Sequence, residues 1–223
     1  MSYSVAYKSV RKYYIGGMMM LIATAITTLG LVFTLLVASV VNEDLLGEPL
    51  DYGDTYAAFV TNATDIAITG SVMMHLGLVL LIVAYIINVI GLASTVKESR
   101  LFKQGLVCGI AMLAISIAAA FLLFFAGNYI ITVVTLLLST IVNMFIMLIV
   151  TNGIRKISTG LSFKKSIGLI KVIVIIALFL NLMEFIIPVY AFVFAAISGL
   201  ALIVSCICYL NVLKKARKKL NLS

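Results

Sequence analysis

The sequence predicts an all-α integral membrane protein with six transmembrane helices arranged as three hairpins and both termini in the cytoplasm. Two observations lead to this fold class. Of the 223 residues, 64% are hydrophobic and only 11% are charged, whereas soluble domains contain about 45–50% apolar and about 25% charged residues. The Lys and Arg residues also cluster at the two ends of the chain and in alternate connections, and short connections rich in these residues stay cytoplasmic.

The first expected element is a short amphipathic helix over residues 1–14, lying on the inner leaflet. Tyr3, Tyr7, Val10 and Tyr14 share one helical arc, and the basic residues turn away from that arc. The first membrane span is expected over residues 15–41, which is longer than the roughly 20 residues that a bilayer requires. An acidic external loop over residues 42–65 follows, because it holds six of the eight acidic residues together with Gly and Pro turn formers.

The other five membrane spans are expected over residues 66–96, 105–126, 130–151, 167–187 and 189–213. Very short turns connect the third span to the fourth and the fifth to the sixth, so these neighbours must be antiparallel. Residues 214–223 are expected to form a basic cytoplasmic tail. The bias towards Lys, Ile and Asn is typical of an AT-rich bacterial genome, so we expect this protein in a bacterial plasma membrane.

Polar side chains inside the spans are the candidates for chemistry, because lipid supplies no water to satisfy them. Thr135, Ser139 and Asn143 recur at helical spacing and predict one polar stripe along the fourth span. Asn88 is a similar polar residue in the second span. Such residues either line a water-accessible path or supply hydrogen bonds between helices, and the sequence leaves both interpretations open.

Glu184 is the single acidic residue expected inside a span, and Asn181 lies three residues earlier on the same helical face. His75, the only histidine, is expected at a similar depth. Buried ionisable residues of this kind often serve transport, so the pair is a candidate for exchanging a proton or binding a cation. The alternative is that Glu184 reaches the outer interface and His75 makes one ordinary hydrogen bond.

The chain carries no motif of a known catalytic or cofactor site. One histidine cannot supply the paired axial ligands of a b-type haem, and C-x-x-C, G-x-S-x-G and H-E-x-x-H motifs are absent from the sequence. The acidic residues between Glu43 and Asp54 do not have the spacing of an EF-hand loop. We therefore expect neither enzymatic activity nor a cofactor or metal centre.

Two classes of function remain open. The leading hypothesis is a small membrane transport protein, either a channel, a carrier or the substrate-binding subunit of a transporter. Its polar path would comprise Glu184, His75, Asn181, Asn143, Ser139, Thr135 and Asn88. The alternative is a non-transporting membrane partner, such as an assembly, immunity or regulatory subunit, in which these residues hold helices together.

The expected partners follow from the distribution of charge. The net charge of +8 arises from residues beside the spans, where they meet the lipid bilayer and its anionic headgroups. Nucleic acid is therefore not an expected partner. A small solute or ion, a second copy of the chain and another membrane protein all remain possible partners.

Overall fold

The computed structural model describes residues 3–46, 53–97, 99–126, 129–157, 164–187 and 190–221. It contains six long helices: α1 (Tyr3–Leu46), α2 (Gly53–Thr95), α3 (Arg100–Ala126), α4 (Tyr129–Ile157), α5 (Lys164–Ile186) and α6 (Ala191–Asn221). The described residues include no strand. The predicted all-helical fold is confirmed, and all six helices are long and apolar enough to cross a membrane.

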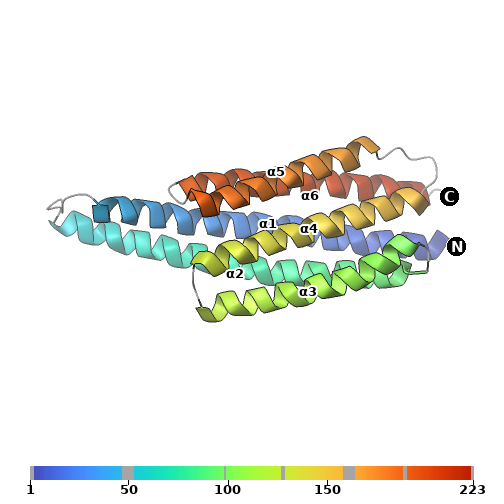
Figure 1. Ribbon diagram of the computed structural model, residues 1–223, viewed down its shortest axis with the longest axis horizontal. Coiled ribbons are helices and arrows are strands. Elements are labelled where there is room, and N and C mark those ends of the chain that lie inside the picture. The colour runs from blue at the N-terminus through green and yellow to red at the C-terminus, as the bar shows by residue number, and fades with distance from the viewer. Residues whose placement is uncertain are drawn as a thin grey trace.

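The six helices run along one common direction (Figure 1), and their contacts form a closed ring. Each helix packs against its neighbours in the chain, and the last helix, α6, returns to pack along α1. The contact between α1 and α2 is the most extensive, while α4 also touches α6 across the bundle. Because α2 packs on α3 and α4 packs on α5, the contacts do not separate the six helices into three hairpins. That arrangement stays a prediction.

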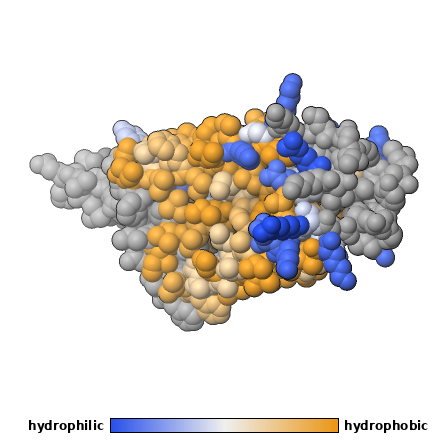
Figure 2. Space-filling view, turned by 45° about the vertical axis from the view of Figure 1, so that its right-hand side comes forward, coloured by the Kyte–Doolittle hydropathy of each residue, from blue (hydrophilic) through white to orange (hydrophobic). Residues whose placement is uncertain are grey.

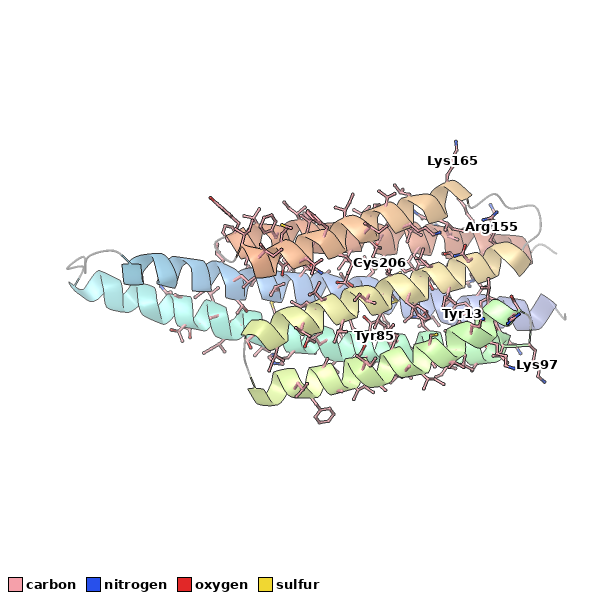
Figure 3. The ribbon with its side chains drawn as sticks, viewed as in Figure 1. Tyr13, Tyr85, Lys97, Arg155, Lys165 and Cys206 are labelled. Atoms are coloured by element: carbon pink, nitrogen blue, oxygen red, sulfur yellow. The ribbon has the colours of Figure 1, made fainter. Side chains whose placement is uncertain are left out.

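The two ends of the bundle differ in shape and charge. α1 begins and α6 finishes at the same end (Figure 1), which we call the terminal end. Lys97, Arg155 and Lys165 also lie there (Figure 3). At the opposite end, α1 and α2 extend beyond the other four helices (Figure 1). The basic connections and both chain ends therefore share one side of the molecule.

The outer surface of the bundle is apolar. Figure 2 shows a broad hydrophobic surface, with hydrophilic side chains gathered towards the terminal end. Large apolar side chains point outwards from every helix, including Ile22, Val72, Val107, Val134, Ile175 and Leu200. Helices in lipid satisfy their backbone hydrogen bonds internally and can expose such side chains to hydrocarbon. The six apolar helices and this surface indicate a multi-pass membrane protein.

The beginning of the chain departs from the expected interfacial helix over residues 1–14. α1 continues without a break from Tyr3, and Val10 and Tyr13 are buried in the core. The ring of Tyr13 stacks on Phe102 with centroids 6.4 Å apart, and its hydroxyl lies 2.7 Å from Thr95 Oγ1. Val10, one member of the arc that we expected to rest on lipid, therefore lies in the protein core.

The expected acidic loop over residues 42–65 is also corrected, because most of it is helical. α1 continues to Leu46 and α2 begins at Gly53. Both helices therefore extend past their apolar spans. Residues 47–52 lie outside the described residues. The basic segment expected as a tail over residues 214–223 continues α6 as far as Asn221, and Ala216 in this segment is fully buried.

Small residues recur every seven positions where α1 and α2 meet. They are Gly16, Ala23 and Gly30 on α1, and Gly70, Gly77, Ala84 and Gly91 on α2. A Cβ added to Gly30 would lie 2.5 Å from both Gly70 O and Met74 N. The two helices therefore approach backbone to backbone, as small residues permit in membrane proteins.

Candidate functional site

A polar-lined cavity of about 30 Å³ lies within the bundle, and we call it the central cavity. Five helices line it: α1 supplies Thr24, Thr27, Thr28 and Leu31, α2 supplies Leu81, α4 supplies Leu136, Ser139, Thr140 and Asn143, α5 supplies Asn181, and α6 supplies Ala195, Ser198, Gly199 and Leu202. A single water requires roughly 10–15 Å³ of such volume. The central cavity therefore has room for about two water-sized groups.

Hydrogen bonds tie the helices together around the central cavity. Asn181 Nδ2 of α5 donates to Thr140 Oγ1 of α4 at 2.9 Å. Ser198 Oγ of α6 donates to Glu184 Oε1 of α5 at 3.2 Å. The hydroxyl of Tyr85 on α2 donates to the carbonyl oxygen of Ser139 on α4 at 3.1 Å. These bonds fix the positions of the polar groups that face the cavity.

Three buried side-chain atoms among the described residues have no hydrogen-bond partner, and all three belong to residues that line the central cavity. They are Thr24 Oγ1, Thr27 Oγ1 and Asn143 Oδ1. Thr24 is 4% exposed and Asn143 is 1% exposed. Buried polar groups in proteins are almost always paired, and leaving one unpaired costs about 1–3 kcal/mol. A polar molecule or ion bound in the central cavity could therefore pair with these atoms.

The three unpaired atoms are not equivalent. Thr27 Oγ1 lies against Gly77 of α2, where that residue has no side chain. Thr24 lies beside the thiol of Cys206, which is only a weak hydrogen-bonding group. Asn143 Oδ1 is an amide oxygen with two lone pairs. Asn143 and Thr24 therefore have the strongest unmet hydrogen-bonding capacity.

The predicted stripe on α4 faces the interior, but its members differ. Ser139 and Asn143 line the central cavity, whereas Thr135 lines a second cavity of about 10 Å³ between α2, α3 and α4. Thr135 Oγ1 donates to the carbonyl oxygen of Ile131 at 2.7 Å, and Ser139 Oγ donates to that of Leu136 at 2.8 Å. Their hydroxyls are thus satisfied by their own helix.

Asn181 and Glu184 both lie close to the central cavity. Asn181 lines the central cavity directly. Glu184 is 1% exposed and is joined to the cavity wall by its bond with Ser198. The carboxyl group is therefore held inside the bundle, beside the cavity.

Asn88 and His75 lie in other surroundings. Asn88 is buried over Gly16 of α1, where its Nδ2 donates to the carbonyl oxygen of Ala84 at 2.8 Å. His75 is partly buried, with Nδ1 2.6 Å from the carbonyl oxygen of Ser71 on its own helix. Proton exchange between His75 and Glu184 stays a prediction.

Thr140, Ser198 and Thr24 belong to the site but are missing from the predicted set. Thr140 precedes Asn143 by three residues and shares its helical face, so helical spacing is a signal that identifies it. Thr24 belongs to a threonine-rich part of α1. Ser198 is fourteen residues after Glu184 and on the next helix, so only the packing of α6 on α5 brings the two together.

The unpaired groups of the site are neutral oxygen atoms, and its one carboxyl group, that of Glu184, bonds to Ser198 beside the cavity. Its unpaired groups are hydroxyls and an amide, and within the described parts of the chain no group of three or more His, Cys, Asp or Glu side chains is placed to hold a metal ion. Neither a protein-family model, nor a curated protein, nor a solved structure matches the chain. The helices indicate a multi-pass membrane protein, and its particular role must be argued from the central cavity.

Proposed function

We propose that the protein is a small membrane transport protein that passes an inorganic solute through the central cavity. The observation that supports this proposal is the convergence of polar side chains from α1, α4, α5 and α6 on one partly open space within an apolar bundle. Polar groups inside a membrane are costly and typically mark solute or ion pathways. Transporters also tend to bind their solutes deep within the membrane, between helices.

The volume of the central cavity narrows the class of solute. Pockets for organic ligands typically enclose about 300–1,000 Å³, whereas the central cavity encloses about 30 Å³. A vitamin, sugar or drug-sized molecule is far too large for it. The solute that fits this conformation is a proton, a water molecule or a small ion.

We expect buried aromatic side chains to obstruct the route from the central cavity to the terminal end. Tyr13 stacks on Phe102, and the ring of Tyr209 lies against Gly17 of α1. All three aromatic side chains are fully buried. Passage of a solute towards this end requires these rings to move, which favours a carrier or a gated channel over an open pore.

The orientation in the membrane belongs to the same proposal. Basic residues cluster at the terminal end, where Lys97, Arg155 and Lys165 lie (Figure 3). Basic connections face the cytoplasm in most membrane proteins. The terminal end would then be cytoplasmic, and Glu184, near the opposite end of α5, would lie towards the outside.

Reconstitution into liposomes tests the transport function. We expect proteoliposomes to take up protons or an alkali cation faster than protein-free liposomes. Asn143→Leu should reduce this flux at least about tenfold, because it removes a polar group worth about 1.4 kcal/mol or more to the passing solute. Thr151→Val is the matched control on α4, since that buried hydroxyl bonds only within its own helix in the described contacts, to Met147 and Leu148.

The absence of flux with every tested ion, in protein that remains folded, would contradict the proposed function. The second candidate is then a non-transporting membrane partner. The extension of α1 and α2 beyond the other helices (Figure 1) favours this candidate, because it offers a surface outside the bundle. Purification from native membranes under mild conditions distinguishes the two, since a partner subunit should co-purify with a second protein in a fixed ratio.

A further inference from the structure

We infer that the central cavity is a binding site for a monovalent metal cation, sodium in particular, with Asn143 Oδ1 and Thr24 Oγ1 as ligands. The inference rests on the proposed function, since it names the solute that passes through the same cavity. Both oxygens are buried, and apart from the weak thiol of Cys206 beside Thr24 the described residues give them no hydrogen-bond partner. Both residues line the cavity from opposite helices, α4 and α1.

The chemistry of the ligand atoms indicates which kind of ion the cavity can bind. Amide and hydroxyl oxygens are hard donors that suit alkali and alkaline-earth cations. Calcium and magnesium are usually bound with one or more carboxylates, whereas no carboxylate lines the cavity and that of Glu184 bonds to Ser198 instead. An anion is also unsuitable, because no Lys or Arg lines the cavity. A monovalent cation is the guest that neutral oxygens can satisfy.

The neighbouring side chains can complete the coordination. Thr140 lines the cavity, and its Oγ1 is held in place by a hydrogen bond from Asn181 Nδ2. Thr27 occupies the space over Gly77, and a threonine in a helix has two accessible χ1 rotamers, so its hydroxyl can turn to the guest. The oxygens of Thr24, Thr27, Thr140 and Asn143, whose residues all line the cavity, are then the candidate ligands of one ion.

The size of the cavity favours a small cation that has lost most of its water. About 30 Å³ accommodates roughly two water-sized groups, which is one ion and one water. A fully hydrated ion does not fit, so protein oxygens must replace its hydration shell, as carbonyl oxygens do in channel filters. Sodium is the smaller of the two common alkali cations, and a comparison with potassium tests which of them the cavity binds.

Thermal unfolding of the purified full-length protein tests the site. Unfolding is measured in sodium, potassium and choline chloride at one ionic strength. We expect saturating sodium to raise the Tm of the wild type by about 5 °C or more over choline, with potassium giving a smaller rise. Asn143→Leu should abolish the sodium-specific rise.

Thr24→Val and Thr151→Val form a matched pair of variants. Without sodium, Thr24→Val should leave Tm unchanged or raise it, because it removes an unpaired hydroxyl and keeps the side-chain shape. In sodium its rise should be at most half that of the wild type. Thr151→Val loses a satisfied hydroxyl, so it should lower Tm in every salt and keep the full rise in sodium.

The outcomes separate the cation site from the transport function. Equal Tm values in sodium and choline would overturn the inference and leave the cavity as hydrated space only. Flux without a sodium-specific rise would also overturn the site while keeping transport, whereas a specific rise without flux would keep the site and overturn transport. If Asn143→Leu does not fold, Thr24→Val and equilibrium binding of radioactive sodium to the wild type decide the question.

Discussion

Asn143 and Thr24 differ from most other polar residues inside the bundle because each has a buried oxygen atom with no hydrogen-bond partner among the described residues. Thr135, Thr151 and Ser205 each donate a hydroxyl hydrogen to a carbonyl oxygen three or four residues earlier in their own helix. A hydroxyl satisfied in this way adds little polarity to the space beside it. An unpaired amide oxygen in the same setting remains available to a guest.

At the residue scale, we predict that Glu184 supplies any pH dependence of transport. Its carboxyl group is buried and accepts a hydrogen bond from Ser198. Glu184→Gln keeps the size and the acceptor oxygen but cannot lose a proton. The flux into liposomes should therefore vary with pH in the wild type and become nearly independent of pH in Glu184→Gln.

Asp65→Asn is the control for Glu184→Gln, because Asp65 is exposed near the beginning of the span in α2. It removes one acidic residue without changing the interior, so its pH profile should match that of the wild type. If Glu184→Gln retains the wild-type profile, Glu184 has a purely structural role between α5 and α6.

The sequence predicts the conspicuous members of the site better than the ordinary ones. Glu184 and Asn143 are noticeable because carboxylates and amides are rare in apolar helices, and both lie at or beside the central cavity. Ser198 and Thr24 are ordinary residues in a chain rich in hydroxyls. Whether a hydroxyl faces the cavity depends on the rotation of its helix, which the packing of glycines and aromatic rings decides.

At the scale of the helices, hydropathy locates the spans but not the ends of the helices. The chain becomes polar near residue 42, yet α1 continues to Leu46 and α2 begins at Gly53. The hydropathy of the sequence indicates where the chain passes from lipid to water. A helix can continue past that boundary until a residue such as Gly or Pro interrupts it. The same reasoning explains why the basic end of α6 remains helical to Asn221.

We predict that the backbone contact between α1 and α2 makes Gly30 intolerant of any side chain. Gly30→Ala would place a Cβ 2.5 Å from backbone atoms of Gly70 and Met74, and backbone cannot move aside as a flexible side chain can. The expected loss is about 1–3 kcal/mol, measured as unfolding in detergent with increasing denaturant.

Gly168→Ala on α5 is the matched control, since a Cβ there would meet nothing within 4 Å. Alanine is the better helix former, so this variant should gain about 0.4–1 kcal/mol. A loss of stability in Gly168→Ala equal to that in Gly30→Ala would show that the close approach of α1 and α2 is not the cause.

At the scale of the whole molecule, we predict that the terminal end faces the cytoplasm. Lys97→Cys is a suitable probe because Lys97 is exposed at this end. Ser99 is less suitable, because its hydroxyl accepts a hydrogen bond from the backbone N–H of Leu101 at the start of α3. After Cys108, Cys206 and Cys208 are replaced, a membrane-impermeant maleimide should label Lys97→Cys only in opened cells.

Thr55→Cys probes the opposite side, because Thr55 precedes the apolar span of α2. This variant should be labelled in intact cells. Labelling of Lys97→Cys from outside, with Thr55→Cys protected, would reverse the orientation of the molecule in the membrane. The charge pattern alone predicts this topology, because the positive-inside preference depends on sequence position and not on helix packing.

The closure of the ring between α1 and α6 has a consequence for biosynthesis. Chains fold from the N-terminus as they are made, so α1 and α2 can pair early, but α1 receives its second neighbour only when the last helix emerges. Until then, Gly17 lacks the ring of Tyr209 and Thr28 lacks Gly199. A chain that ends before α6 leaves one side of α1 and the wall of the cavity open to lipid, which gives the cell a physical means of recognising incomplete copies.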